Sequence, residues 1–291
     1  MSVDPYVQEW VAGTNGRLYV PLIHRLTRYP IPEWPLPPDG CGLVLDVGCG
    51  WGRWMVSAGR RGYVPVGIDV KLEPLQAARR VLRAHGIKAY VVAADLARLP
   101  FRDGVFDLVF SYSAIQHVDR VRATQCVEGL HRILREGGAC LLELPNRFGL
   151  GRLLRLRLAR APDDADPGSW CVRYYSPSEL RSLIGGLFGT CDLRVDCFLG
   201  IGIQRSDLDI LPWGGKAVIL MSEALKTLAR LIPPLARIAD SLYVHAVRRG
   251  SGRVDPESGR RSQLTRVDGS SGEGQEPCRR PVLLPEAARR L

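Results

Sequence analysis

The sequence predicts an α/β fold with a doubly wound, mostly parallel sheet of seven strands and with helical lid and insert elements. Two observations predict it. From residue 42 onward, short aliphatic runs alternate with helix-like amphipathic stretches, as in a parallel sheet covered by helices on both faces. Beyond residue 189, two further strand-like runs flank one long helical stretch.

The first half of this pattern is regular. Aliphatic runs predict strands over residues 42–48, 63–70, 88–95, 106–115 and 139–145. Helices are predicted between them over 52–61, 74–85 and 122–135, the second ending at Gly86 and the third at Gly137 and Gly138. The first strand leads directly into the glycine-rich turn LDVGCGWG, where a ligand could lie close to the backbone.

The pattern changes after residue 146. Ser176, Pro177 and Glu179 predict a capped helix that runs to about Phe188. Strands are predicted over 190–200 and 241–249. Between them a helix is predicted over 217–232, ending at Pro233 and Pro234, and its apolar residues at helical spacing are Val218, Met221, Leu225, Leu228 and Ile232.

On this basis the chain divides into three parts. Residues 1–40 are predicted to be an N-terminal lid or extension, and residues 41–249 the main domain. Residues 250–291, dominated by Gly, Ser, Arg and Glu, are predicted to be a disordered tail. Insertions at 147–175 and 201–238 are expected to join the N-terminal part as substrate-binding or lid elements.

Composition limits the location and the partners. The net charge of +10 comes almost entirely from arginine, and it permits nucleic acid, anionic lipid or an acidic substrate without selecting one. The eight cysteines form no CxxC pair and have no histidine at zinc spacing, so no metal is expected. No apolar run reaches the roughly 18 residues of a membrane span, and the N-terminus has no secretory pattern, which favours a cytoplasmic protein.

The spacing of the glycine turn narrows the ligand. It is D-x-G-x-G-x-G, formed by Asp46, Gly48, Gly50 and Gly52. A triphosphate loop needs a lysine after the glycines, and a dinucleotide loop needs GxGxxG; neither pattern is present. Glycines let a ligand lie on the backbone, the start of the next helix offers N–H groups to a carboxylate, and Asp46 offers a carboxylate to an ammonium group. S-adenosylmethionine combines these features with a ribose and an adenine.

Residues 42 to about 145 resemble the class I S-adenosylmethionine-dependent methyltransferases, and most closely the type 11 group that includes the quinone-ring methyltransferases. Four features carry the resemblance in order: LDVGCGWG, Asp69 at the end of the second strand, Asp95 after the third, and LPFRDGVFDLVFSYSAIQHV running into LHRILREGGACLLELP. The resemblance implies a Rossmann-like methyltransferase fold, S-adenosylmethionine as cofactor, and an enzyme that transfers methyl groups.

By this resemblance the cofactor-binding residues lie at the carboxyl ends of the strands, where open α/β sheets bind ligands. The resemblance assigns Asp46, Gly48, Cys49, Gly50 and Gly52 to the methionine part, Asp69 to the ribose hydroxyls, Asp95 to the adenine amine, Val70 and Leu96 to the adenine ring, and Ser111, through its backbone, to the methyl-donor end.

Methyl transfer from a sulfonium needs alignment more than it needs a protein nucleophile, so what varies is whether a base deprotonates the acceptor. His117 follows the fourth strand, where related methyltransferases often carry a histidine, and it is the catalytic candidate because a histidine can accept a proton near neutral pH. The alternative is that His117 packs over the cofactor or caps the next helix. Tyr112 and Gln116 are expected to be pocket walls.

The expected acceptor is a small-molecule or lipid-like metabolite, methylated on oxygen, nitrogen or carbon. The arm RFGLGRLLRLRLAR, residues 147–160, places leucines on one helix face and suits peripheral contact with an anionic membrane, with a packed lid helix as the alternative. A nucleic-acid (RNA) methyltransferase and a non-catalytic S-adenosylmethionine-binding module are the alternative functions. Nucleic acid is not the expected partner, because the sequence shows no RNA-binding module.

Overall fold

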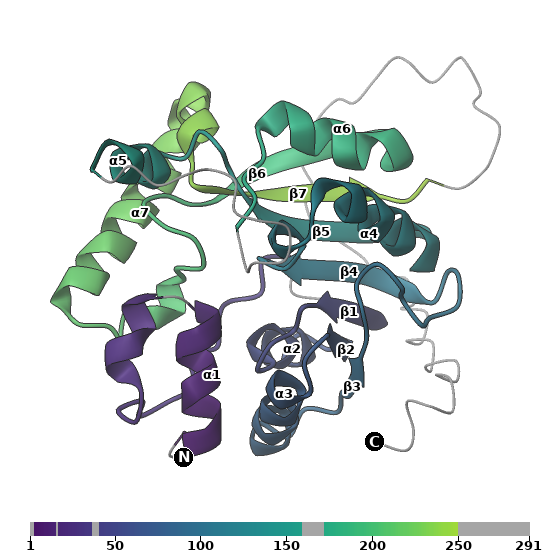
Figure 1. Cartoon of the computed structure of the whole chain (residues 1–291), viewed down its shortest axis with the longest axis horizontal. Coiled ribbons are helices and arrows are strands. Elements are labelled where there is room, and N and C mark those ends of the chain that lie inside the picture. The colour runs from purple at the N-terminus through teal and green to yellow at the C-terminus, as the bar shows by residue number, and fades with distance from the viewer. Residues whose placement is uncertain (1–2, 16, 37–40, 159–171, 250–291) are drawn as a thin grey trace, which may run out of the picture.

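The computed structural model describes residues 3–15, 17–36, 41–158 and 172–249, and its centre is a seven-stranded sheet in the order β3-β2-β1-β4-β5-β7-β6 (Figure 1). Neighbouring strands pair in parallel except β7, which is antiparallel to both β5 and β6. The predicted fold class is therefore confirmed. The strands are β1 (Leu43–Val47), β2 (Val64–Asp69), β3 (Tyr90–Ala93), β4 (Phe106–Tyr112), β5 (Leu134–Pro145), β6 (Cys191–Cys197) and β7 (Ser241–Val247).

Helices cover both faces of this sheet (Figure 1). On one face lie α4 (Arg120–Ile133) and α6 (Pro177–Phe188), and on the other lie α2 (Arg53–Gly59) and α3 (Leu72–Ala84). Adjacent residues of β1 serve the two sides: Leu45 joins the core beneath α4 and α6, whereas Val44 packs in a cluster with Trp54 of α2. β1 is buried on both faces, which agrees with its sequence, aliphatic at every position except Asp46.

The predicted capped helix is confirmed in α6. The Ser176 hydroxyl accepts a hydrogen bond from the Glu179 backbone N–H (3.2 Å), and the Glu179 carboxylate accepts one from the Ser176 backbone N–H (2.6 Å). Pro177 occupies the first turn. The reciprocal pair satisfies two backbone donors that a helix start otherwise leaves unpaired, so the sequence located this helix start correctly.

The predicted end of α4 is wrong. The helix stops at Ile133 and β5 begins at Leu134, so Gly137 and Gly138 lie inside the strand. The reason is an irregularity in the pairing of β5 with β4, where the register shifts. At Gly138 a Cβ would lie only 2.9 Å from the Arg135 carbonyl oxygen, so glycine is required here by the close backbone approach within the irregular strand.

The apolar spacing of the helix after β6 indicates its buried face only in part. This helix, α7 (Trp213–Leu231), starts before residue 217 and ends ahead of Pro233 as predicted. Val218 and Leu225 are partly buried against the core, but Met221 and Leu228 are exposed. Its buried positions are Gly215, Ile219, Ser222 and Ala229. Ser222 is buried because its hydroxyl accepts a hydrogen bond from the Phe198 backbone N–H (3.0 Å). A polar residue therefore marks the inner face, which apolar periodicity could not reveal.

The N-terminal residues pack on the side of α2 and α3. Val7 of α1 (Pro5–Asn15) belongs to one core with Trp51 and residues of α3. Tyr19, in the short helix η1 (Arg17–Leu22), is buried and its hydroxyl donates a hydrogen bond to Asp207 of η3 (Arg205–Asp207). The N-terminal part and the insertion before β7 are thus joined; that they form a lid over a ligand stays a prediction, as do the domain boundaries.

Several predictions concern segments outside the described ranges, namely the tail over 250–291 and residues 159–171 of the first insertion. The arm 147–160 begins as α5 (Leu150–Leu158), where Leu153 and Leu154 are exposed. Within the part of the chain that the structure describes, no helix is long and apolar enough to cross a membrane. In the same part, no group of three or more His, Cys, Asp or Glu side chains is arranged to hold a metal ion.

Candidate functional site

The glycine turn between β1 and α2 has a backbone conformation that favours glycine. Gly48, Gly50 and Gly52 all have positive φ, at +70°, +51° and +83°. At Gly48 a Cβ would come within 2.4 Å of the Ala114 Cβ, so the turn lies directly against the segment after β4. The Gly48 and Cys49 N–H groups donate to the Ile68 carbonyl of β2 (2.8 and 2.9 Å), which holds the turn on the sheet.

Asp46 lies beside this turn, and its carboxyl group is buried with one oxygen unpaired among the described residues. The side chain is 3% exposed, and among the described residues its Oδ2 has no hydrogen-bond partner. Burial, and next the nearby charge of Asp69, raise the pKa of Asp46 to about 8, while the Arg53 guanidinium opposes the shift. A buried carboxyl with an unpaired oxygen suits a cationic ligand group, because an ammonium would both pair with it and restore its charge.

Asp69 ends β2 on the solvent side of the turn. It is half-buried, and burial raises its pKa. Its Oδ2 accepts the Gly50 N–H (3.2 Å) and its Oδ1 accepts the Lys71 N–H (3.1 Å). The hydrogen bond from Gly50 connects Asp69, the residue predicted to bind the ribose, with the turn predicted to bind the methionine part. Val70, predicted to flank the adenine, follows as an exposed side chain.

Asp95 and Leu96 follow β3 and are placed differently from each other. The Asp95 carboxylate accepts hydrogen bonds from the Arg122 guanidinium (2.5 Å) and from the Ala97 N–H (2.9 Å), so it is held in place at the edge of α4. Leu96 is buried in the core beneath α4 and α6. The roles of these two residues at an adenine stay predictions.

The remaining predicted residues lie near the ends of β1 and β4. Ser111 is fully buried, and its hydroxyl donates to the Val47 carbonyl (3.2 Å), which fastens β4 to β1. Cys49, within the glycine turn, is buried, and burial raises its thiol pKa far above the ordinary value. His117 lies in the short helix η2 (Ile115–His117), its Nε2 3.4 Å from Gln116 Nε2, and its catalytic role stays a prediction.

The structure brings Arg53, which the sequence reasoning passed over, into this site. It is the first residue of α2, is 6% exposed, and has one guanidinium nitrogen, Nη1, without a partner among the described residues. The guanidinium lies 5.3 Å from the centre of the Trp54 ring and 5.6 Å from that of Tyr112. An arginine directly after a glycine turn was the available signal, since this position falls beside whatever the turn binds.

Glu143 at the end of β5 is a second residue that the sequence reasoning passed over. Its side chain is 1% exposed and its Oε1 has no partner in the described part of the chain. Its Oε2 accepts a hydrogen bond from the Ser113 hydroxyl (2.5 Å). Ser113 has a positive φ of +56° and precedes Ala114, the residue that packs against Gly48. Glu143 is therefore connected to the glycine turn through two neighbouring residues of one loop.

Asp196 on β6 is held by three donors on the same side of the sheet. Its Oδ2 accepts hydrogen bonds from the Tyr112 hydroxyl (2.8 Å) and the Ser241 hydroxyl (2.7 Å), and the Gln204 amide lies 3.5 Å from Oδ1. Gln204 also donates to the Tyr112 hydroxyl (2.8 Å). Burial, and then the charge of Asp196, raise the pKa of Glu143 to about 8.

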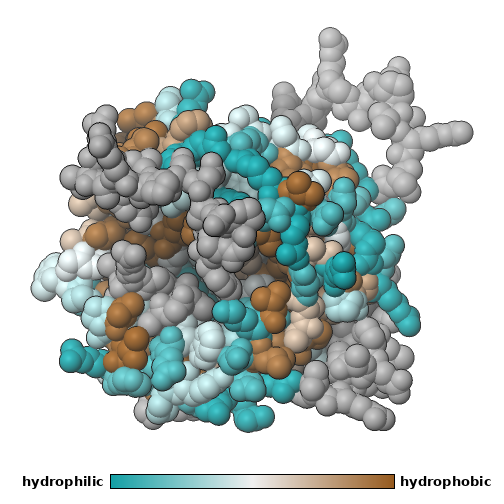
Figure 2. Space-filling model, in the orientation of Figure 1, coloured by the Kyte–Doolittle hydropathy of each residue, from teal (hydrophilic) through white to brown (hydrophobic). Residues whose placement is uncertain are grey.

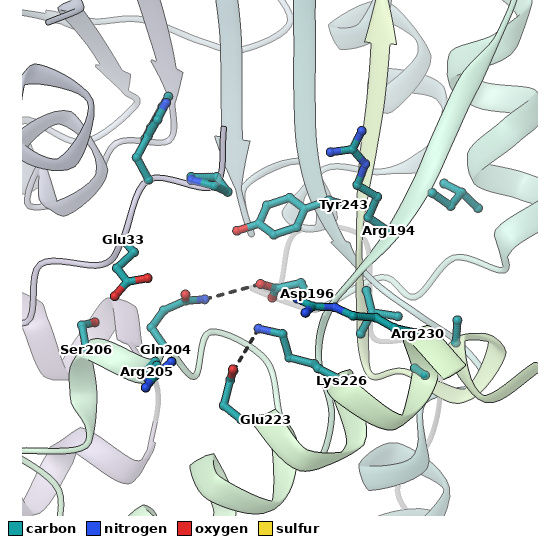
Figure 3. Close-up of a pocket in the computed structure, with 16 residues that line it drawn as sticks. Glu33, Arg194, Asp196, Gln204, Arg205, Ser206, Glu223, Lys226, Arg230 and Tyr243 are labelled. Carbon is teal, nitrogen blue, oxygen red and sulfur yellow. Dashed lines mark hydrogen bonds and ion pairs between the residues drawn. The ribbon is translucent and has the colours of Figure 1, made fainter. Parts of the chain in front are cut away.

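A pocket of about 680 Å³ opens beside this network. Figure 3 shows it between the segment at Glu33, the strand residues Asp196 and Tyr243, and the α7 residues Lys226 and Glu223, which form an ion pair (2.9 Å). The inner wall is thus the polar network at the sheet edge, and the outer wall is α7. The site as a whole combines one buried guanidinium, Arg53, with four buried carboxyl groups, on Asp46, Glu143, Asp196 and Asp207.

Comparison with known proteins agrees with this geometry. A family model described as "Methyltransferase domain" matches residues 44–138, which span the glycine turn through the start of β5. A protein of Encephalitozoon cuniculi whose name describes it as a methyltransferase is 39% identical over 160 residues, covering 53% of this chain and 68% of its own length.

Two further relatives carry more specific names. A malonyl-[acyl-carrier protein] O-methyltransferase of Hamiltonella defensa is 32% identical over 124 residues, covering 43% of this chain and 45% of its own. An 18S rRNA (guanine-N(7))-methyltransferase of Schizosaccharomyces pombe is 30% identical over 118 residues, covering 37% and 43%. The chain spans about half the length of the first curated relatives that it matches.

Among solved structures, the methyltransferase in a complex with the Trm112 methyltransferase activator of Haloferax volcanii has a TM-score of 0.51 at 17% identity. The match covers 85% of this chain and all of the other. At 17% identity, this similarity shows a shared fold and nothing more.

Proposed function

The chain belongs to the class I S-adenosylmethionine-dependent methyltransferases, and from this we propose that it methylates a hydroxyl or amine group of a small-molecule or lipid-like acceptor. The observation that carries the choice of acceptor group is the buried Glu143 carboxyl, whose Oε1 has no partner in the described chain and which is connected to the glycine turn through Ser113. When bound, the cofactor supplies a methyl group already activated on a sulfonium.

The residues at the turn fit this cofactor. Asp46 offers an unpaired buried carboxyl oxygen to its ammonium group, and the glycines leave room for a ligand on the backbone. Arg53 has an unpaired Nη1 among the described residues, which suits the methionine carboxylate. Asp69 keeps a half-exposed carboxylate for the ribose hydroxyls, and Asp95 lies further along the same edge of the sheet for the adenine amine.

The charges beside the turn favour an acceptor with a proton to lose. With pKa values of about 8, the Asp46 and Glu143 carboxyl groups are mostly neutral near pH 7, and Glu143 becomes a carboxylate that can take up a proton as the pH rises. Glu143 accepts the proton of the acceptor hydroxyl or amine as the new bond to carbon forms. Its raised pKa, about 8, makes its carboxylate a stronger base than an ordinary carboxylate near neutral pH. Asp196, held by Tyr112 and Ser241, provides a fixed hydrogen-bond acceptor beside it.

Two named relatives act on other acceptors, a malonyl-[acyl-carrier protein] and an 18S rRNA guanine at N7. A carboxylate oxygen and a guanine N7 carry no proton near neutral pH, so their methylation needs no base. A buried carboxyl that can accept a proton therefore favours a hydroxyl or amine acceptor.

Formation of S-adenosylhomocysteine from S-adenosylmethionine with a panel of phenols, alcohols, amines, carboxylates and RNA tests this proposal. We expect turnover with a phenol, alcohol or amine, and a rate that rises with pH up to about 8 as Glu143 loses its proton. Glu143→Gln should lower kcat by about a hundredfold or more with S-adenosylhomocysteine affinity unchanged. His117→Ala is the competing variant and should change kcat by less than about threefold.

Three outcomes would count against the proposal. Turnover confined to carboxylates or RNA would refute the acceptor class. If Glu143→Gln kept full activity and His117→Ala were inactive, His117 would be the base that accepts the proton. Failure of calorimetry to detect binding of either S-adenosylmethionine or S-adenosylhomocysteine at millimolar concentration would refute the function as a whole.

A further inference from the structure

We propose that the outward face of α7 docks this protein on an anionic lipid surface. The face consists of Trp213, Leu220, Met221, Leu228 and Leu231, which we call the α7 stripe. All five side chains are exposed, Trp213 to 80% and Leu231 to 77% of their area. They recur at helical spacing, so they form one line along the 19 residues of the helix. Figure 2 shows apolar residues gathered on the side of the molecule where α7 lies in Figure 1.

The α7 stripe is apolar, as surfaces that contact a partner or a membrane are. Ile219, Ser222 and Ala229 pack α7 against the domain, and the stripe lies on the opposite side of the same helix. A helix that is apolar on both sides is normally covered on both sides. Scattered exposed apolar residues are ordinary on soluble proteins, but five in one line form a patch of the kind that marks a partner or a membrane.

The charges beside the stripe indicate what covers it. Residues 213–238 contain four cations, Lys216, Lys226, Arg230 and Arg237, against the single acid Glu223, which pairs with Lys226 (2.9 Å). By helical geometry Lys216 lies on one flank of the stripe, whereas Arg230 lies further round the helix, next to the buried Ile219. An apolar helix face with a cationic flank is the arrangement of helices that lie in the headgroup region of anionic bilayers. Trp213 adds an aromatic residue of the type that anchors proteins at this interface.

A second copy of the chain fits the stripe less well than lipid does. A two-fold interface uses the same surface on both partners, so it would bring the excess of cations around the stripe close to the same excess on the other copy. Anionic headgroups would instead neutralise that excess.

Neighbouring segments extend the same surface. The Asn146 side-chain amide donates to the Arg237 carbonyl (2.9 Å), and the Gly151 N–H donates to the Asp240 carboxylate (3.0 Å), so the start of α5 is held beside the turn η4 (Pro233–Ile238) that follows α7. The exposed Leu153 and Leu154 of α5 therefore lie near the end of the stripe. The inner flank of α7 also lines the 680 Å³ pocket through Lys226 and Arg230, so docking would hold that pocket next to the lipid.

Flotation of the full chain with vesicles tests the proposal. The vesicles are phosphatidylcholine alone, or phosphatidylcholine and phosphatidylglycerol in a two-to-one ratio, at physiological and at high salt. We expect binding to the mixed vesicles that weakens with salt, and about tenfold or greater loss of binding in the double variant Leu220→Ser, Leu231→Ser. Lys216→Gln should lower binding to the mixed vesicles and reduce its salt dependence.

The matched control is the double variant Val121→Ser, Leu187→Ser, which removes two exposed apolar side chains from α4 and α6 and should bind as the wild type does. Circular dichroism and calorimetry with S-adenosylhomocysteine show that each variant is folded. The proposal is overturned if the wild type fails to bind the mixed vesicles at physiological salt, or if the stripe variant binds them as strongly as the control. It is equally overturned if light scattering shows a dimer that only the stripe variant dissociates.

Discussion

The proposed donor side and the proposed acceptor side of the site are built from different kinds of structure. On the donor side, the short stretch from Asp46 in β1 to Arg53 at the start of α2 contains the three glycines, and Asp69 and Asp95 complete it. On the acceptor side, side chains from β4, β5, β6, the following loop and β7 meet in one network, through contacts such as that between Tyr112 and Asp196. Backbone conformation defines the first, and tertiary packing of side chains defines the second.

The two sides should therefore lose function in response to different changes. A donor side that depends on backbone shape should be most sensitive to a change that blocks the turn. An acceptor side that depends on buried carboxyl groups should be most sensitive to pH, because each buried carboxyl without enough donors favours its neutral form. Changes of each kind can therefore test whether the two sides are as distinct as the structure indicates.

The largest effect is expected from Gly48→Ala on the donor side. The added Cβ would lie 2.4 Å from the Ala114 Cβ at a φ of +70°, so affinity for S-adenosylhomocysteine should fall by about a hundredfold or more, measured by calorimetry. Gly86→Ala is the control, since Gly86 has a φ of +67° but open space around it. Equal losses in the two variants would mean that the close approach to Ala114 has no part in binding.

The next largest effect is expected from Glu143→Gln on the acceptor side, in stability. Burial raises the pKa of Glu143 to about 8, so between roughly pH 5 and pH 8 the folded state keeps a proton that the unfolded state has lost, and the free energy of unfolding falls as pH rises. Removing this group should leave the variant more stable than the wild type at pH 9, by about 1.4 kcal/mol for each unit of the pKa difference, and no more stable at pH 5.

Urea unfolding at both pH values measures this effect. Glu128→Gln, which removes an exposed carboxyl of α4, is the control and should follow the wild-type curve. If the Glu143→Gln and wild-type stabilities run parallel from pH 5 to pH 9, the acceptor side is not defined by this carboxyl.

A smaller effect is expected from Asp69→Ala, which probes the donor side without blocking the turn. Loss of the ribose ligand and of the contact with the Gly50 N–H should weaken S-adenosylhomocysteine binding by about tenfold or more, or about 1.4 kcal/mol. Asp103→Ala removes an exposed acid that pairs with Arg132 away from the turn, and should bind normally. Unchanged affinity of Asp69→Ala would refute the ribose assignment.

The smallest effect is expected outside both sides, at the start of α6. Ser176→Ala removes the reciprocal cap with Glu179 and should lower the free energy of unfolding by about 1 kcal/mol, with S-adenosylhomocysteine affinity unchanged. Ser178→Ala, inside the helix, should have a smaller effect on stability. A change in affinity for Ser176→Ala would show that α6 is coupled to the site, against the separation described above.

The sequence by itself determined the sheet, the glycine turn and the start of α6. These features depend on residues close together in the chain: aliphatic runs buried on both faces, glycines with positive φ, and a cap between Ser176 and Glu179. Local backbone conformation and burial follow from such short patterns, so they can be predicted from one sequence.

Only the tertiary structure decided the rest. The inner face of α7 is set by Ser222 meeting the backbone of Phe198, and β5 starts at Leu134 because it pairs with β4. The acceptor network likewise joins Tyr112 to Asp196, 84 positions along the chain. These contacts depend on which segments the fold places side by side. Contacts between residues that are far apart in the chain produce no periodic pattern in the sequence, so they could not be predicted from it.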